Sequence, residues 1–214
     1  HFCKKIDNLS FMDLKLGISS IRERENIVQS DLVADHISDF YYHVIERTKK
    51  NLTIELVDAV LEKIKAARRI YIFGVGSSGL SALELNQRLI RMGMNSVCVT
   101  DSHMMLINST LVTEEDVVIG ISVSGETEDI NKAIKLAKVR GSEIIGLTAF
   151  SESELAKLSD LHLQAYNSTF VNNERFVNSQ FALMYVIDIL SMKLLGDDRY
   201  QYAMLQTVET ILTQ

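Results

Sequence analysis

Two short stretches of the sequence combine hydroxyl side chains with glycine, and each follows an apolar run. They are residues 74–80, which read GVGSSGL, and residues 117–129, which read VVIGISVSGETED. Serine and threonine hydroxyls can surround a phosphate without a fixed cation, and glycines let the backbone approach it closely. Each stretch also leads into a helix pattern, and the start of a helix favours an anion. The two stretches therefore predict a site for a phosphorylated ligand.

Helix capping is a simpler explanation of either stretch, because serine and threonine often accept hydrogen bonds from the first N–H groups of a helix. Two such stretches at one edge of a sheet favour a ligand. The acidic residues Glu126, Glu128 and Asp129 oppose a phosphate, since they follow at once and would repel a dianion that they faced. Glu126 could instead accept hydrogen bonds from the hydroxyl groups of a sugar.

The elements that must position these residues alternate between strands and helices from Arg69 onward. Five apolar runs rich in Val, Ile and Tyr predict strands: RRIYIFG, NSVCVTD, DVVIGISV, SEIIGLTAF and DLHLQAY. Amphipathic stretches such as SALELNQRLIRMG and TEDINKAIKLAKVRG lie between most of them and predict crossover helices. This pattern predicts an α/β fold in which helices cover both faces of a five-stranded parallel sheet. With the flavodoxin-like order 2-1-3-4-5, both hydroxyl stretches face one crevice at the switch point.

The first 68 residues contain only helical patterns, and the stretch from about residue 174 to the end is helical again. Thr53 is the expected N-cap of the helix that begins TIELVDAV. We therefore expect an N-terminal helical extension before the sheet. The chain starts with His1 rather than methionine, and HFCKKI is similar to the end of a helix. We expect the chain to be a fragment of a longer protein.

Composition argues against several classes of protein. The 214 residues are 47% hydrophobic and 23% charged, as in globular domains. No apolar run reaches the roughly 18 residues of a membrane helix, and no signal-peptide pattern is seen. The two cysteines, Cys3 and Cys98, fit a reducing cytoplasm. The net charge of −6 argues against nucleic-acid binding by the chain as a whole. We expect no metal and no cofactor, because no metal-ligand spacing surrounds His36, His43 or His162.

A dinucleotide is an alternative ligand. Gly74, Gly76 and Gly79 match the G-x-G-x-x-G fingerprint, and Asp101 follows the second predicted strand about where a ribose-binding acid would lie. The fingerprint is weak by itself, and it leaves the second hydroxyl stretch unexplained. The sequence has no G-K-[ST], so it contains no P-loop.

The segments IYIFGVGSSGL and ISVSGETEDINKAIKLAKVRG together resemble the sugar isomerase (SIS) domain, a phosphosugar-binding fold. TDSHMMLINSTLVTEEDVV and SQFALMYVIDIL are similar to the RpiR family of bacterial transcription regulators, in which a helix-turn-helix domain precedes the SIS domain. HFCKKIDNLSFMDLKLGISS resembles the end of that DNA-binding domain. The resemblance covers nearly the whole chain. It implies a helix-turn-helix remnant at residues 1–25, a helical linker at 26–68 and an SIS domain at 69–214.

The resemblance also implies which residues hold the phosphate. Each of them carries a hydroxyl group, and they are Ser77, Ser78, Ser122, Ser124 and Thr127. Gly125 joins them as a candidate because a glycine lets the backbone approach the ligand closely. The family often has Ser-Arg in the late helix, where this sequence has Ser179-Gln180, and this glutamine would weaken any contact that the arginine makes with a ligand or a partner subunit. His103 could hydrogen-bond a sugar across a dimer, although a histidine that fills a loop is the simpler interpretation.

We therefore expect the effector-sensing module of a cytoplasmic, sugar-phosphate-responsive transcription regulator, which binds its ligand without catalysis. We expect a homodimer or homotetramer, no membrane contact, and operator DNA bound only through the helix-turn-helix domain. A sugar-phosphate isomerase or lyase on the same fold is the rival, and it needs a general base near the sugar carbon. Glu126 and Glu174 are the candidates for that base. Glu174 and Arg175 could also reach a neighbouring subunit's pocket, although a solvated helix start is simpler.

Overall fold

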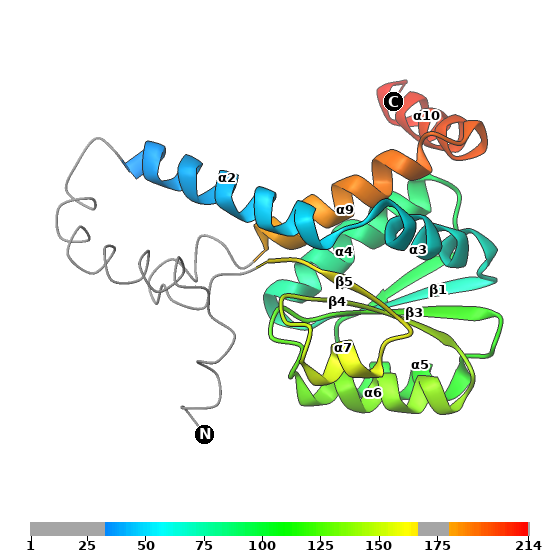
Figure 1. The fold of residues 1–214 in the computed structure, drawn as a ribbon. Coiled ribbons are helices and arrows are strands. Elements are labelled where there is room, and N and C mark those ends of the chain that lie inside the picture. The colour runs from blue at the N-terminus through cyan, green and yellow to red at the C-terminus, as the bar shows by residue number, and fades with distance from the viewer. Residues whose placement is uncertain (1–32, 167–179, 214) are drawn as a thin grey trace, which may run out of the picture.

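The computed structural model describes residues 33–166 and 180–213 (Figure 1). The helices are α2 (Val33–Asn51), α3 (Ile54–Ala66), α4 (Gly76–Arg91), α5 (Ser102–Leu111), α6 (Glu128–Val139), α7 (Glu154–Leu158), α9 (Phe181–Leu194) and α10 (Asp198–Leu212). The strands are β1 (Arg69–Phe73), β2 (Ser96–Val99), β3 (Asp116–Ile121), β4 (Glu143–Thr148) and β5 (Leu161–Gln164). The expectations for Cys3, Glu174, Arg175, Ser179 and residues 1–25 fall outside the described residues.

The five strands form one parallel sheet in the order β2-β1-β3-β4-β5, which confirms the predicted flavodoxin-like order. β1 lies between β2 and β3, so that Phe73 is in register with Val99 on one side and Gly120 on the other. The switch point therefore lies where β1 and β3 run side by side. Every residue of β3 is buried, as expected for a run that is apolar throughout.

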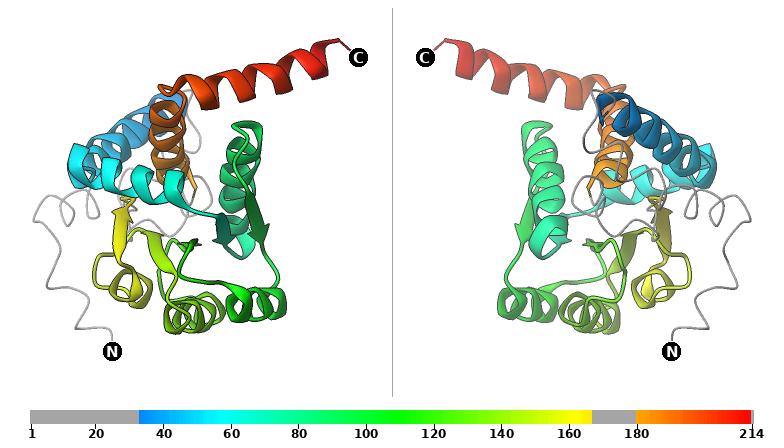
Figure 2. Two further views of the ribbon diagram at one scale, coloured as in Figure 1. Left: turned by 90° about the vertical axis from the view of Figure 1, so that its right-hand side faces the viewer. Right: turned by 90° about the vertical axis from the view of Figure 1, so that its left-hand side faces the viewer.

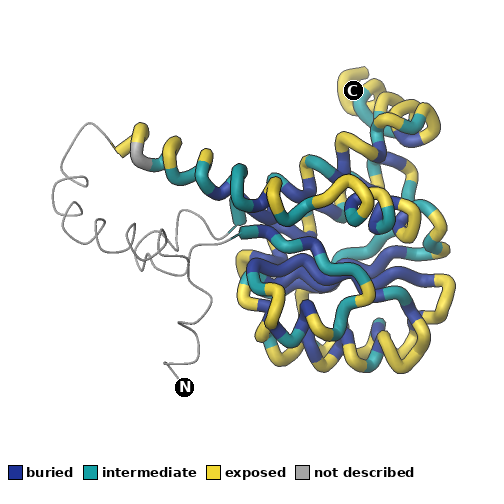
Figure 3. Tube along the Cα trace, in the orientation of Figure 1, coloured by how far each residue is buried: buried dark blue, intermediate teal, exposed yellow. Residues whose placement is uncertain are grey.

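Helices cover both faces of the sheet and divide the core into two layers (Figure 1). Ile70 and Ile72 face α2, α3, α4 and α9, whereas Tyr71 and Phe73 face α5, α6 and α7. This alternation is the two-residue period of a strand. In Figure 3 the buried residues concentrate in the sheet, while α10 and the first part of α2 are largely exposed.

The helical extension shares its core with the sheet. Val44 of α2 and Val57, Val60 and Ile64 of α3 are buried in the same layer as Ile70. Thr53 is the N-cap of α3, as predicted, and its side chain accepts a hydrogen bond from the backbone N–H of Leu56 at 3.2 Å. Of the helices within residues 33–166 and 180–213, none is long and apolar enough to cross a bilayer.

Three helices differ from the predicted pattern. α4 begins at Gly76, so Ser77 and Ser78 lie in its first turn rather than in a loop before it. Gly76 permits this tight start because it adopts a positive φ of 56°. α5 and α7 were not predicted from periodicity. α5 carries no Asp, Glu, Lys or Arg, and α7 has only five residues, so neither shows a clear amphipathic period.

Candidate functional site

Both hydroxyl stretches lie at the carboxyl edge of the sheet, beyond neighbouring strands. β1 ends at Phe73 and passes within three residues into α4, while β3 ends at Ile121 and leads into α6. β1 and β3 are parallel and hydrogen-bonded to each other, so the two connections emerge side by side. The structure thus brings the two stretches to the predicted switch point.

The helices that start at this edge beside β1 and β3 lack side-chain caps. The N-cap residues of α4 and α6 are Val75 and Thr127, and neither side chain accepts a capping hydrogen bond. A side chain caps each of α3, α5, α7 and α10, namely Thr53, Asp101, Ser153 and Asp197. The first N–H groups of α4 and α6 carry partial positive charge and have no such acceptor. An anion bound at these two helix starts would accept hydrogen bonds from these N–H groups.

Three hydroxyls of the β3–α6 connection form a cluster. Ser122 is buried, and its Oγ lies 2.9 Å from Thr127 Oγ1 and 3.5 Å from Ser124 Oγ. Ser122 Oγ also accepts a hydrogen bond from the backbone N–H of Gly125 at 3.1 Å. Ser124 is exposed, and its Oγ accepts from the backbone N–H of Glu126 at 3.2 Å. Because Glu126 precedes α6, Ser124 closes a local turn and does not cap the helix.

Gly125 is fixed against α7. It has a positive φ of 66°, and a Cβ built on it would lie 2.1 Å from Ser153 Oγ, so a larger residue does not fit. Its carbonyl oxygen accepts hydrogen bonds from the backbone N–H of Leu155 at 2.9 Å and from Asn131 Nδ2 at 3.1 Å. Asn131 also donates to Glu154 Oε2 at 3.0 Å. These contacts fix Gly125, and with it the β3–α6 connection, against the start of α7.

Asn131, Ser153 and Glu154 position the candidate site, and the sequence analysis missed all three. Asn131 gives no sequence signal, because one asparagine in an amphipathic helix is ordinary. Ser153 could have been found as the first residue of Ser-Glu-Leu-Ala, since serine before an acidic first turn is typical of an N-cap.

Two of the three acids at this helix start are bound by other protein groups. Glu126 Oε1 accepts a hydrogen bond from the backbone N–H of Glu154 at 3.1 Å, at the start of α7. Glu128 pairs with Lys132 at 2.7 Å, and this ammonium group lowers the pKa of Glu128. Glu126 thus helps to hold the start of α7, and this contact competes with its predicted role in binding sugar hydroxyls. Repulsion of a dianion by these two carboxylates is reduced for the same reason.

The first stretch is tightly packed around its glycines. A Cβ at Gly79 would lie 3.0 Å from the carbonyl oxygen of Gly74 and 3.2 Å from Thr100 Cγ2, beyond β2. Glycine therefore lets the first turn of α4 pack against the ends of β1 and β2. Within that turn Ser78 is buried and Ser77 is exposed.

The same contacts explain the apparent dinucleotide fingerprint. Gly74 is tightly enclosed too, since a Cβ there would lie 2.8 Å from the carbonyl oxygen of Ser78. Asp101 is the N-cap of α5, and its Oδ1 accepts from the backbone N–H of Met104 at 2.9 Å. Packing and capping thus account for Gly74, Gly79 and Asp101 without a dinucleotide.

The remaining candidates are scattered. His103 is exposed in the first turn of α5. Burial raises the pKa of the Cys98 thiol to about 11, so it is protonated at neutral pH and is not an activated nucleophile. Within the part of the chain that the structure describes, no three His, Cys, Asp or Glu side chains gather as a metal would require.

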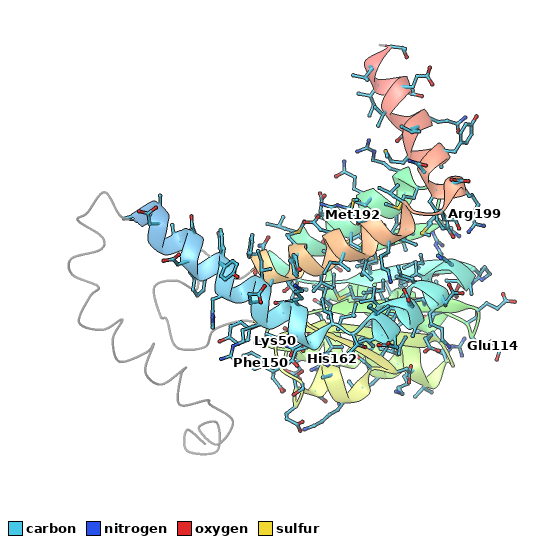
Figure 4. The ribbon with its side chains drawn as sticks, turned by 45° about the horizontal axis from the view of Figure 1, so that its top comes forward. Lys50, Glu114, Phe150, His162, Met192 and Arg199 are labelled. Carbon is cyan, nitrogen blue, oxygen red and sulfur yellow. The ribbon has the colours of Figure 1, made fainter. Side chains whose placement is uncertain are left out.

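A polar network lies behind the β3–α6 connection, between Thr148 at the end of β4 and His162 in the first half of β5. His162 Nε2 is 2.9 Å from Thr148 Oγ1, and Thr148 Oγ1 is 3.4 Å from Ser153 Oγ, the atom against which Gly125 packs. Burial lowers the pKa of His162, which favours the neutral imidazole in this network. Figure 4 shows His162 and Phe150 at one end of the sheet and Glu114 at the other.

Comparisons with known proteins agree with this arrangement. A family model described as the SIS domain matches residues 63–192. An HTH-type transcriptional regulator of Clostridium perfringens is 30% identical over 200 residues, which cover 88% of this chain and 72% of that protein. The NanR protein of Vibrio vulnificus, solved in complex with ManNAc-6P, matches with a TM-score of 0.79 and 23% identity. That match covers 89% of this chain and 72% of the NanR chain.

The sugar isomerase domain of an RpiR transcription factor from Sphaerobacter thermophilus matches with a TM-score of 0.75 and 21% identity, over 86% of this chain and 100% of that domain. At these identities the two solved structures establish the shared fold. The family model covers more than half of the chain, and the Clostridium relative matches over most of its own length. The chain therefore belongs to the SIS-domain family and, within it, to the HTH-type transcriptional regulators that the resemblance to RpiR proteins predicted.

Proposed function

We propose that this chain is the effector-sensing module of a transcription regulator of sugar metabolism, and that it binds a sugar phosphate without transforming it. The observation that carries the proposal is the pairing of two helix starts without side-chain caps, those of α4 and α6, at the switch point of the sheet. The phosphate lies between them and accepts hydrogen bonds from their N–H groups. Hydroxyls complete the site, and they come from Ser77, Ser78, Ser122, Ser124 and Thr127.

The comparisons support a phosphorylated sugar as the ligand. The NanR protein, which has the same fold, is complexed with ManNAc-6P. In our proposal the phosphate of the effector occupies the cluster around Ser122, while its sugar extends outward over the carboxyl edge of the sheet. The protein is cytoplasmic, and it contacts operator DNA through a helix-turn-helix domain, of which residues 1–25 are the end.

Isomerisation on this fold would require a general base beside the sugar carbon. Of the two candidate bases, Glu126 hydrogen-bonds the start of α7, and Glu174 lies outside the described residues. His103 is exposed on α5, and no hydrogen bond joins it to Glu126 among the contacts of residues 33–166 and 180–213. The contact of Glu126 with α7 favours binding over catalysis.

A thermal-shift screen with hexose and pentose phosphates tests the proposal. A phosphosugar at about 100 times its dissociation constant should stabilise the protein by about 2.7 kcal/mol, because it binds the folded state alone. The matching unphosphorylated sugar should leave the melting temperature nearly unchanged, since the helix starts bind the phosphate. Incubation with the bound phosphosugar should yield no isomer. Stabilisation by NAD instead of any phosphosugar would contradict the proposal, and so would turnover of the sugar.

A further inference from the structure

A hollow of about 310 Å³ lies beside α10 at the amino edge of the sheet, at the opposite end of the strands from the candidate site. Its walls come from the last turn of α3, the start of β1, the turn between α4 and β2, and the first turns of α10. Figure 2 shows α10 leaving the end of α9 and running outward, and Figure 4 places Arg199 at the corner between the two helices. The hollow has the volume of a small-molecule site.

Buried apolar side chains form the floor of the hollow. Ile64 and Ile70 are each 2% exposed, and Tyr200, the one buried residue of α10, closes the side toward that helix. Gly93 and Ala203 are the small residues of the opposite walls, and a Cβ built on Gly93 would lie 3.4 Å from Ala203 Cβ. The turn after α4 and α10 therefore approach each other closely and bound the hollow between them.

Two cations line the hollow, and none of the described residues that line it is acidic. Lys65 is the first cation, and it lies in the last turn of α3, where a positive charge is favoured by the negative end of the helix. Lys65 Nζ is also 3.6 Å from Glu62 Oε1. The helix end and Glu62 thus account for Lys65 without a ligand.

Arg199, the second cation, has no such explanation. It lies in the first turn of α10, where the helix dipole disfavours a positive charge, and it forms no ion pair within the part of the chain that the structure describes. Asp197 accepts a hydrogen bond from the backbone N–H of Arg199 instead. The guanidinium lies 4.3 Å from the centre of the Tyr200 ring and donates a hydrogen bond to the Tyr200 hydroxyl. A buried tyrosine therefore holds an uncompensated positive charge at the hollow.

We propose that the hollow beside α10 is a second ligand site, which binds a small organic carboxylate with a short apolar body. The planar guanidinium of Arg199 binds the carboxylate through two parallel hydrogen bonds, and Lys65 adds a positive charge nearby. The apolar body covers Ile70 and Met92 on the floor. The volume holds about ten non-hydrogen atoms at the roughly 30 Å³ that a water molecule occupies in the liquid. One charge on the ligand suffices, because one of the two cations has a carboxylate partner already.

A titration with hexanoate, followed by NMR of isotope-labelled methionine methyl groups, tests this site. Met92 and Met94 line the hollow, whereas Met105 and Met192 lie outside its lining and serve as internal controls. We expect hexanoate to shift the Met92 and Met94 resonances with a dissociation constant on the order of 1 mM and to leave the controls unchanged. Hexanol lacks the charge and acetate lacks the apolar body, so each should bind at least about tenfold more weakly.

Two variants separate the charge of the hollow from its space. Lys65→Gln combined with Arg199→Gln removes both cations and should raise the dissociation constant of hexanoate at least about tenfold. The matched control combines Lys50→Gln with Arg140→Gln, which removes the same charge from two exposed positions elsewhere, and should change it less than about twofold. Ala203→Leu fills the hollow without a change of charge and should abolish the shifts. Circular dichroism should show unchanged helix content in all three proteins.

The second site is ruled out if hexanoate leaves the Met92 and Met94 resonances unchanged or if hexanol binds as tightly as hexanoate. It is also ruled out if the variant without Lys65 and Arg199 binds hexanoate like its control. Met92 and Met94 resonances that shift with protein concentration instead of with hexanoate would overturn the proposal too, because a second copy of the chain would then cover the hollow.

Discussion

Ser124 is the exposed hydroxyl of the β3–α6 connection, and its Oγ accepts a hydrogen bond from the backbone N–H of Glu126 at 3.2 Å and lies 3.5 Å from Ser122 Oγ. Its neighbour Ser122 is buried and bonded on two sides, so Ser122 shapes the connection while Ser124 is open to a ligand. The 3.5 Å between their Oγ atoms is long enough for Ser124 to turn toward a phosphate without breaking a strong bond.

Ser124→Ala should therefore weaken phosphosugar binding and leave folding almost intact. A hydrogen bond to a charged phosphate contributes about 1.5–3 kcal/mol, so affinity measured by titration calorimetry should fall roughly 10- to 150-fold. Ser38→Ala, which removes an exposed hydroxyl on α2, is the matched control and should have no effect on affinity. A lower melting temperature with unchanged affinity would show that Ser124 only stabilises the turn.

At the scale of elements, the candidate site depends on how α7 holds the β3–α6 connection. Gly76 and Gly125 make the dependence measurable, because both adopt positive φ, at 56° and 66°. A Cβ at Gly76 would meet nothing within 4 Å, whereas one at Gly125 would lie 2.1 Å from Ser153 Oγ. A larger residue would strain the backbone at both positions, but its Cβ would collide with α7 only at Gly125.

Gly76→Ala should cost about 1–2 kcal/mol of unfolding free energy, the cost of the left-handed conformation alone. Gly125→Ala should cost about 1–3 kcal/mol more, because Ser153 and α7 must move. It should also abolish phosphosugar binding, since the hydroxyl cluster moves with the backbone. Urea denaturation and calorimetry measure the two effects. Equal stability losses in the two variants would show that α7 does not hold the connection in place.

At the scale of the whole molecule, the candidate site and α10 lie at opposite ends of the sheet. The hydroxyl stretches follow the carboxyl ends of β1 and β3, while Ile70 at the start of β1 lines the hollow beside α10. No described side chain is shared between the two regions, and changes at distant sites without shared partners usually add.

A variant that combines Leu205→Gln with Leu212→Gln, at two exposed positions of α10, should therefore bind the phosphosugar within about twofold of the wild type. Combining it with Ser124→Ala should give the sum of the separate effects on affinity, within about 0.5 kcal/mol. Calorimetry on the wild type, the α10 variant, Ser124→Ala and their combination measures the coupling energy of this double-mutant cycle. A larger coupling energy would show that α10 and the candidate site are linked.

The sequence by itself determined the fold class and the two stretches that form the candidate site. Each of these depends on local patterns. Apolar runs with two buried faces, helices of 3.6-residue period and glycines after strands are all encoded within a few residues of one another. Thr53 was predicted as an N-cap for the same reason, since capping involves residues three positions apart.

Only the tertiary structure decided what surrounds those stretches. Glu126 contacts the start of α7, 28 residues further along the chain, and Gly125 packs against Ser153. Asp101 and Gly79, which match a dinucleotide fingerprint, serve a helix cap and a close packing contact instead. Likewise, the sequence predicted helix at the C-terminal end, but not that α10 projects from the fold and contacts α4 through Thr207 and Arg91, with Tyr200 as its one buried residue. Contacts between residues distant in sequence depend on how the layers pack, and a local pattern carries no record of that packing.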